Sequence, residues 1–416
     1  MLNILYIGAA QISNPSIAVF SRSLLRSLHS SHHKVYVYGN NLFYEYFTNP
    51  ETVLPDSIAT INWDIVIVQN SLCFSLYSEI IRSLRKSPII FVSQADDFTG
   101  YIAPFENLYT VISLSEANRA TWNIPVELCK PLKIPVTVTG SYYRFDEKPE
   151  CYELVYYPVQ NSNAEIDGKL LSFTAFFNNR LTIVGEEYRT LKAAMNNRVR
   201  VVARKKSIAA FKKAHLVLAS GHQAIQAVAL CKPCVVVGDH GLGGKITVEN
   251  YELFKKYGFR GRAGAANDEY IPSDLLQAVI QSVLITACEE EMKALQKLVL
   301  DDGYNYNDFH RTIAQTIDQV LKLHTYICNK QLNKSLKPCL PGTFQVRKIN
   351  KKNIITCGQV HFNEVGDDFL ALLRQCDGTQ TIEEIVMKND YGQKIIRLFA
   401  DNILELWKKK LVVFNL

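Results

Sequence analysis

The stretch AHLVLASGHQAIQAVALCKP, residues 214–233, combines a short strand, a turn of small residues and a helix. Leu216–Ala219 is apolar on both faces, as in a buried parallel strand, and the helix begins directly after Ser220-Gly221. Glycine lets the backbone approach a ligand closely, and the first turn of a helix offers unpaired N–H groups to an anion. The stretch therefore predicts a βα unit with an anion site at its turn. The alternative is an ordinary tight turn of a doubly wound sheet.

A second glycine-rich segment follows the next predicted strand, Cys234–Val237. It reads GDHGLGGK, residues 238–245, and its four glycines and one lysine are suited to a diphosphate. Together the two segments predict that consecutive turns contact the same ligand, although each alone is also typical of a turn that binds nothing.

The same alternation of strand and helix extends along the chain. Buried strands are predicted at Ile4–Ile7, Lys34–Tyr38, Asp64–Gln69, Ile89–Ser93, Thr110–Leu114, Leu154–Tyr157, Leu181–Val184 and Val199–Ala203. Helices are predicted at Ser16–Leu28, Leu76–Arg85 and Asn307–His324. An interruption at Thr139–Glu150 divides the pattern into two halves. It predicts an α/β fold with two tandem Rossmann-like domains, residues 1–140 and 141–325, in which ligands bind beyond the carboxyl ends of the strands.

Composition excludes several classes of protein. The net charge of +6 permits acidic partners without requiring them. Ten cysteines include the pair Cys231 and Cys234, but no second pair completes a metal site, so we expect no metal and a reducing compartment. No apolar run approaches the ~20 residues that span a bilayer. Asn3–Gly8 indicates a first core strand and not a signal peptide, so the sequence predicts a cytoplasmic protein.

Residues 214–233 resemble the nucleotide-sugar-binding signature of GT-B-fold glycosyltransferases, in which a strand and a small-residue turn precede EA-x-A-x-GKP. The run Gly244–Tyr251 with Tyr257–Arg262 is similar to the TPENF…NFSGR-like segment of a bacterial subgroup. The resemblance implies a nucleotide-sugar donor as co-substrate and no permanently bound cofactor. It assigns donor contacts to Arg204, Ser220, Gly221, His222, Gln226, Gly241, Gly243, Gly244, Lys245 and Glu249.

The chain departs from this family at several positions. Gln226 stands where a glutamate usually grips the ribose hydroxyls, and an uncharged amide would bond them more weakly. Cys231 stands where glycine is typical. Many relatives also have a histidine near the end of the fourth strand, where this chain has Asp96 and Asp97. One of these aspartates is predicted to act as general base if burial raises its pKa. The alternative is a loop or helix-capping aspartate and a loss of activity.

Two cations and a histidine complete the predicted donor site. Arg204 directly follows a predicted strand and Lys245 ends the second glycine-rich segment, so both are predicted to neutralise a leaving diphosphate. His222, at the head of a helix, is predicted to contact donor phosphate. For each cation the alternative is a solvated basic surface.

The pattern changes after Leu340-Pro341-Gly342. Residues 326–342 carry lysines without acids over Lys330–Lys337, which indicates an exposed linker. Residues 343–416 predict an α+β winged-helix-like domain. Its predicted elements are strands at Phe344–Lys348, Asn353–Thr356 and Val360–Asn363, helices at Glu364–Cys376 and Gln393–Lys409 around a capping box of Thr381 and Glu384, and a closing run at Leu411–Phe414.

This last region resembles the PqqD-like family of recognition elements for ribosomally made peptides. The resemblance implies that a leader peptide adds as a strand beside the third strand and lies against the third helix. Lys394 and Arg397 would suit an acidic leader. A module that only packs or dimerises is the alternative, and the lack of a dense basic and amide row on any helix argues against nucleic acid. The predicted groove is lined by Gln359, Val360, Phe362, Lys394, Arg397, Leu398 and Asp401.

The sequence thus predicts a glycosyltransferase that recruits a precursor peptide through its C-terminal domain and transfers a sugar to it from a nucleotide sugar. Two alternatives remain open: an inactive GT-B-like scaffold that presents a peptide to a partner enzyme, and a glycosyltransferase for a cell-surface glycan.

Overall fold

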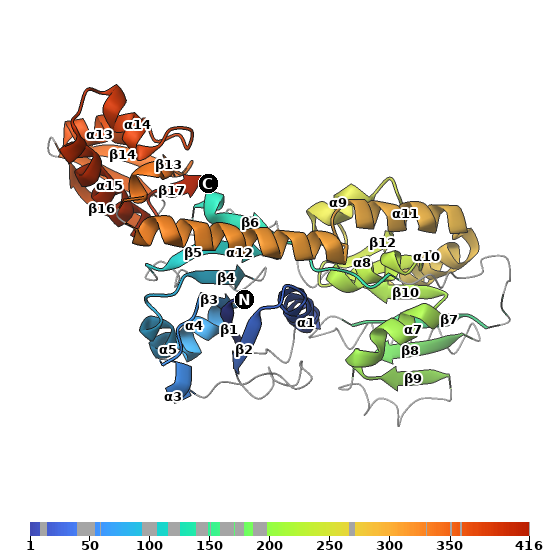
Figure 1. Cartoon of the computed structure of the whole chain (residues 1–416). Coiled ribbons are helices and arrows are strands. Elements are labelled where there is room, and N and C mark those ends of the chain that lie inside the picture. The colour runs from blue at the N-terminus through green and yellow to red at the C-terminus, as the bar shows by residue number, and fades with distance from the viewer. Residues whose placement is uncertain are drawn as a thin grey trace. The chain divides into compact units, whose positions relative to one another are not determined.

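The computed structural model describes residues 1–8, 15–39, 55–58, 60–93, 106–114, 125–138, 149, 151–158, 170, 179–185, 198–265, 271–329, 331–349, 352–357 and 360–415 (Figure 1). The chain forms two compact units. Unit 1 comprises Met1–Gln11, Ser21–Leu132 and His310–Leu416, and unit 2 comprises Ile12–Phe20 and Lys133–Phe309.

Unit 1 contains a parallel sheet in the order β2-β1-β3-β4-β5-β6. Its strands are formed by apolar runs, and every residue of β3 and β4 is buried, as expected for a sheet covered on both faces. The helix predicted at Leu76–Arg85 is shorter in the structure: it corresponds to α5, which begins at Ser78 because Tyr77 leaves the helical conformation and separates α5 from α4. The elements are β1 (Asn3–Gly8), α1 (Pro15–Ser30), β2 (Lys34–Gly39), α3 (Pro55–Ile58), β3 (Ile65–Gln69), α4 (Ser71–Leu76), α5 (Ser78–Ser83), β4 (Ile89–Ser93), β5 (Leu108–Ser113), η2 (Val126–Leu128) and β6 (Cys129–Pro131).

Unit 2 contains a second sheet in the order β12-β11-β10-β7-β8-β9. All neighbours are parallel except β12, which pairs antiparallel with β11. Buried clusters lie on both faces of this sheet. The elements are β7 (Glu153–Tyr156), β8 (Arg180–Val184), β9 (Val199–Val202), η4 (Arg204–Lys206), α7 (Ser207–Lys213), β10 (Leu216–Ala219), α8 (Gly221–Ala229), β11 (Cys234–Gly238), β12 (Gly241–Lys245), α9 (Tyr251–Lys256), α10 (Ser273–Thr286) and α11 (Glu289–Asp301). The predicted α/β fold with parallel sheets is confirmed.

The long helix α12 (Tyr306–Cys328) precedes the C-terminal region, which holds a three-stranded antiparallel sheet, β14-β15-β16, and a separate antiparallel pair, β13 and β17. The predicted capping box is present: Thr381 Oγ1 accepts from the N–H of Glu384, and Glu384 accepts from the N–H of Thr381. The elements are η5 (Asn333–Ser335), β13 (Lys337–Cys339), β14 (Phe344–Ile349), β15 (Lys352–Cys357), β16 (Val360–Val365), α13 (Asp367–Leu373), α14 (Ile382–Lys388), α15 (Gln393–Lys408) and β17 (Val413–Asn415).

The helix predicted from Glu364 begins three residues later. Pairing with β15 extends through Val365, and Gly366 then takes the N-cap position of α13. The sheet ladder therefore outcompetes the helical pattern over the first residues of the predicted helix.

Residues predicted as an exposed linker are only partly exposed. Lys334 and Lys337 face solvent, but Asn333 and Leu336 are buried, and β13 pairs with β17. The predicted domain boundaries at 140, 325 and 342 remain a prediction.

The C-terminal region shares a core with the first sheet. Val413 of β17 lies in one buried cluster with Val111 of β5 and Leu128. The buried Lys410 ammonium donates to the carbonyls of Leu108 and Glu106 at 2.7 and 3.2 Å. The N–H of Gly342 donates to Glu127 Oε1 at 2.8 Å. The region is thus an integral part of unit 1. Among the described residues, no helix is long and apolar enough to cross a membrane.

Candidate functional site

The first predicted turn lies between β10 and α8 in unit 2. Ser220 is extended, and Gly221 has a φ of +55°, a left-handed conformation that glycine adopts without strain. A Cβ added at Gly221 would meet no atom within 4 Å. The backbone N–H of His222 makes no hydrogen bond to any part of the chain that the structure describes. The turn therefore offers open space and a free N–H at the positive end of a helix.

Two histidine nitrogens beside this turn also have no partner. His222 Nε2 and His240 Nδ1 are buried and make no hydrogen bond to described residues. Burial lowers the pKa of His222 to about 4, so its imidazole is neutral near pH 7 and can donate only one N–H. Buried polar atoms are nearly always paired in folded proteins, so these two nitrogens indicate a place where a further polar group binds.

One short segment holds the turns after β10 and β11 together. The carbonyl of Phe259 accepts from the N–H of Gly221 at 2.8 Å, and the carbonyl of Arg260 accepts from the N–H of His240 at 2.9 Å. Arg260 also forms an ion pair with Asp239. The two predicted turns therefore do lie at one edge of the sheet, joined by residues far along the chain. The sequence resemblance includes this segment only as part of a motif, and it assigns no role to His240.

The second glycine-rich segment is not a βα turn. Gly241, Gly243, Gly244 and Lys245 form β12, the edge strand of a hairpin with β11. A Cβ at Gly243 would lie 2.4 Å from the carbonyl oxygen of Gly261, so this glycine is required by close packing of two backbones. The interpretation of this segment as a βα turn is wrong, because pairing with β11 reverses the chain.

Lys245 is already paired. Its ammonium lies 2.5 Å from Glu291 of α11, and both side chains are largely buried. Neutralising a diphosphate would require Lys245 to give up this partner. Glu249, four residues on, is exposed, and hydrogen bonds from Thr247 and from its own backbone lower the pKa of its carboxyl.

Gln226 is also occupied. Its Oε1 accepts from the N–H of Thr137 at 2.8 Å, and its Nε2 donates to the carbonyl of Thr137 at 2.8 Å. Both polar ends of the buried side chain therefore fasten the segment Lys133–Val138 onto α8. A ribose contact would require at least one of these bonds to break, so we leave Gln226 out of the donor site proposed below.

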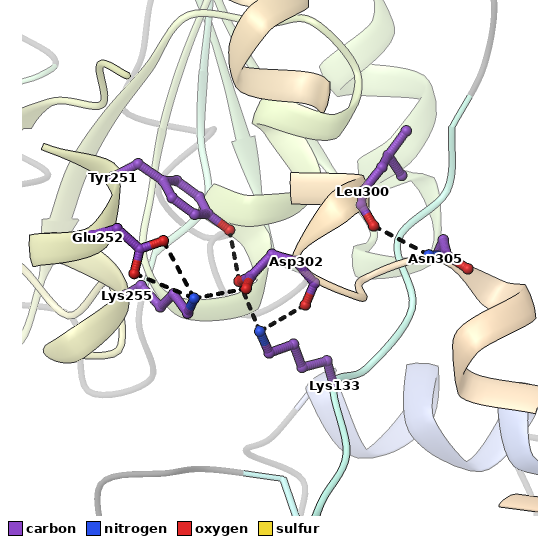
Figure 2. A network of polar contacts seen from close by, with 7 residues as sticks. All are labelled: Lys133, Tyr251, Glu252, Lys255, Leu300, Asp302 and Asn305. Carbon is purple, nitrogen blue, oxygen red and sulfur yellow. Dashed lines mark hydrogen bonds and ion pairs between the residues drawn. The ribbon is translucent and has the colours of Figure 1, made fainter. Parts of the chain in front are cut away.

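The same segment is held at its start by a carboxylate (Figure 2). Asp302 lies 2.8 Å from the Lys133 ammonium and 2.6 Å from that of Lys255, and it accepts from the Tyr251 hydroxyl at 3.2 Å. Burial raises the pKa of Asp302, but the hydrogen bonds from the two lysines outweigh it and lower the pKa overall. The N–H of Val136 donates to the carbonyl of Tyr304. Residues 133–138 are thus fixed to unit 2 at three points.

Arg204 lies at the carboxyl edge of the sheet, as predicted. It opens η4 directly after β9, and its guanidinium lies over the ring of Tyr157 at 5.4 Å from the centroid. Tyr157 follows β7, the neighbour of β10 in the sheet, and its N–H donates to Leu218. Arg204 is therefore positioned along the edge that carries the α8 turn.

Asp96 and Asp97, the predicted general bases, lie outside the described residues. So does Gln359 of the predicted peptide groove, and for Val360 and Phe362 only the backbone, in β16, is described. No group of three or more acidic, histidine or cysteine side chains that could hold a metal ion occurs in the described ranges.

A groove of about 450 Å³ lies between the end of β16, α13 and α15. It uses the stripe Ile395, Leu398, Phe399 and Asn402 of α15, whereas the predicted stripe was Lys394, Arg397, Leu398 and Asp401. Only Leu398, which is 58% exposed, belongs to both. The groove is thus offset by one residue around α15 from the predicted peptide-binding surface, which remains a prediction. Lys394, Arg397 and Asp401 are exposed on the neighbouring stripe, and the described residues that line the groove include two carboxylates, Glu364 and Asp368, and no cation.

Comparison with solved structures supports the fold. The glycosyltransferase from Rickettsia africae ESF-5 is similar with a TM-score of 0.51 and 14% identity, over 77% of this chain and 99% of that chain. UDP-N-acetylglucosamine 2-epimerase from Rickettsia bellii gives a TM-score of 0.49 and 12% identity, over 79% and 98%. No protein-family model and no curated protein sequence matches the chain. At 14% identity, the similarity to the Rickettsia africae structure shows the α/β fold with parallel sheets and nothing finer.

Proposed function

We propose that this protein is a glycosyltransferase that uses a nucleotide sugar, and that the donor diphosphate binds at the N-terminus of α8. The observation that carries the proposal is the free N–H of His222 beside the open, left-handed Gly221. Helix N-termini bind phosphate groups through such N–H donors and the helix dipole. The shared fold with a glycosyltransferase from Rickettsia africae is consistent with this placement.

Neighbouring groups would complete the donor site. The neutral imidazole of His222 can donate an N–H to a phosphate oxygen, and His240 offers a second unpartnered nitrogen for a polar group of the donor. Arg204, whose charge lies over the Tyr157 ring, would neutralise charge on the leaving diphosphate. Asp96 or Asp97 remains the proposed general base toward an acceptor hydroxyl.

The acceptor we propose is a ribosomally made peptide held by the C-terminal region. β16 is an edge strand of its sheet, so one row of its backbone groups is open to pairing with an added strand. The groove beside it is lined mainly by apolar side chains of α13 and α15 and has acidic residues at Glu364 and Asp368. It therefore suits an apolar peptide side chain better than the acidic segment expected from Lys394 and Arg397.

The experiment combines the full chain with radiolabelled nucleotide sugars and the short peptides encoded beside its gene. We expect one peptide to gain the mass of one sugar. Leu398→Glu places a charge in the groove and abolishes this gain, whereas Met387→Glu, at a similarly exposed position of α14 outside the groove, leaves it intact. Peptide binding without sugar transfer by any donor would instead favour the inactive scaffold. Sugar transfer that Leu398→Glu does not affect would overturn peptide recruitment by the groove.

A further inference from the structure

A second hollow lies within unit 1 and shares no described lining residue with the groove on α15. Its volume is about 520 Å³, which is within the range of small-molecule sites. It is formed by the end of α5, the start of β5, the end of α12 and the end of α15. The hollow thus lies where the C-terminal region packs on the first sheet.

One wall of this hollow is strongly basic. Arg82, Arg85 and Lys86 are exposed side chains at the end of α5, and none forms an ion pair with another described residue. Lys408 adds a fourth cation, already paired with Glu405 at 2.6 Å. Glu106 is the only carboxylate among the described lining residues. The wall therefore carries a surplus of positive charge, and three of its cations, Arg82, Arg85 and Lys86, have no ion-pair partner among the described residues.

The opposite wall is aromatic. Tyr109 packs edge-on against Trp407, with ring centroids 4.9 Å apart, and its hydroxyl is 2.7 Å from His324 Nδ1. Trp407 is 3% exposed, and its indole N–H has no hydrogen-bond partner among the described residues. Burial lowers the pKa of His324, so this wall adds no further charge near pH 7. An unpartnered buried donor beside free cations indicates a missing acceptor.

We infer that this hollow binds a small organic phosphate. The planar guanidinium groups of Arg82 and Arg85 match the oxygens of a phosphate, and Lys86 adds a point charge. The aromatic wall with Ile327 would take the ring or chain that carries the phosphate. Because β5 belongs to the first sheet and α15 to the C-terminal region, a bound ligand would also stabilise the contact between the two.

The first test is titration of the full chain with phenyl phosphate, followed by tryptophan fluorescence, since Trp407 lines the hollow. We expect saturable quenching that disappears in Trp407→Phe, and weaker binding of inorganic phosphate and of phenol. Arg82→Gln combined with Arg85→Gln should weaken binding at least about tenfold, measured by calorimetry. The control pair Lys212→Gln and Lys213→Gln in α7 removes the same charge elsewhere and should not change it.

Uridine monophosphate identifies the source of the phosphate when it is titrated into Gly221→Ala, which weakens the proposed donor site at α8, and its binding is followed by the fluorescence of Trp407 in the hollow. Tighter binding than that of phenyl phosphate indicates a nucleotide, and equal or weaker binding indicates another organic phosphate; either supports the site. Equal affinity in the Arg82/Arg85 double variant and the parent, or no binding of phenyl phosphate at millimolar concentration, overturns it. Gly221→Ala, which alters only the α8 turn in unit 2, should leave phenyl phosphate binding unchanged. The two sites are therefore tested by separate variants, so a wrong assignment of one would be detected whether or not the other binds its ligand.

Discussion

Glycine serves two different purposes at the α8 edge of the second sheet. Gly221 is needed for its backbone conformation and has open space around it, whereas Gly238 is needed because another backbone lies against it. A Cβ at Gly238 would lie 2.1 Å from the carbonyl oxygen of Arg260 and 3.0 Å from Ser220 Cβ. The first feature leaves room for a ligand, and the second fixes the segment that joins the two turns.

Gly238→Ala should therefore lower the free energy of unfolding by about 1–3 kcal/mol or more, because the methyl group overpacks a backbone contact. Gly244→Ala in the same hairpin is the control: its φ is +91° and no atom lies within 4 Å, so only backbone strain of roughly 1 kcal/mol is expected. Urea unfolding measures both. Equal costs for the two variants would contradict the close contact.

The buried Lys410 makes the free energy of unfolding depend on pH. Burial lowers its pKa from 10.5 to about 7, against the attraction of Glu106. Between these values the unfolded chain binds one more proton than the folded chain. Stability therefore rises with pH by up to about 1.4 kcal/mol per unit, and the cost of the buried charge is fully present below pH 7.

Lys410→Met should flatten this rise between pH 7.5 and 9.5. The measurement is the free energy of unfolding across that range, followed by the fluorescence of Trp407, whose ring lies 4.4 Å from the ammonium. Parallel pH profiles for the parent and Lys410→Met would show that burial does not lower the pKa of Lys410 in the folded chain.

The local sequence pattern predicts the placement of a residue whose role depends on its neighbours in the sequence. It fails where the residue bonds a partner far away in the sequence. Ser220, Gly221 and His222 belong to a strand, a turn and a helix that follow one another directly, and the structure places them as predicted. The amide of Gln226 bonds Thr137, 89 positions away, which no spacing reveals. Lys245 pairs with Glu291 for the same reason.

At the scale of elements, α8 has two tasks: its N-terminus opens onto the proposed donor site, and Gln226 fastens Lys133–Val138. Gln226→Ala should remove two hydrogen bonds and lower the free energy of unfolding by about 1–2 kcal/mol. The loss is limited to this range because the N–H and the carbonyl of Thr137 can partly form hydrogen bonds with water instead. Nucleotide affinity should stay within about twofold of the parent, since 0.4 kcal/mol corresponds to a factor of two. A ribose contact predicts the reverse result: unchanged stability in urea and a clear loss of affinity in nucleotide titration.

The predicted strands of the two parallel sheets lie within a few residues of the observed ones, because runs apolar on both faces have few alternatives to a covered parallel sheet. The short strands β6 and β13 were not predicted. β12 was missed because Gly241–Lys245 has almost no side chains to show a period, and its pairing with β11 is decided by backbone contacts to Gly261. The start of α13 was missed because Glu364 and Val365 satisfy a helical pattern but pair with β15. The sequence thus predicted whether a segment is helix or strand where packed side chains decide it, and predicted it less well where contacts between backbones decide it.

At the scale of the whole chain, the C-terminal region is a partner of the first sheet as well as a proposed peptide-binding element. A deletion of residues 339–416 would remove Val413 from the core around Val111 and Leu128, and Trp407 from Tyr109. Buried side chains of this size each contribute about 1.5–3 kcal/mol, so the melting temperature of the truncated chain should fall by on the order of 10 °C.

Thermal unfolding of the truncated chain and of Leu398→Glu separates the two roles of the region. Leu398→Glu alters only an exposed groove residue and should keep the parent melting temperature. A truncated chain that melts with the parent would show that the region is a tethered module. For this reason a loss of peptide binding on deletion would not by itself locate the groove.

The proposed sugar transfer depends most on the α8 turn as the donor site. The most direct measurement is calorimetric titration of uridine, guanosine and thymidine diphosphates into the parent, Gly221→Ala and Gly303→Ala. The two glycines both have positive φ and open surroundings, so the variants share backbone strain, but only the Gly221 methyl enters the space beside the free N–H of His222. We predict that one diphosphate binds the parent and Gly303→Ala alike and binds Gly221→Ala at least about tenfold more weakly, the loss of roughly one charge-assisted hydrogen bond. Binding that Gly221→Ala leaves unchanged, or no binding of any diphosphate, would contradict the claim.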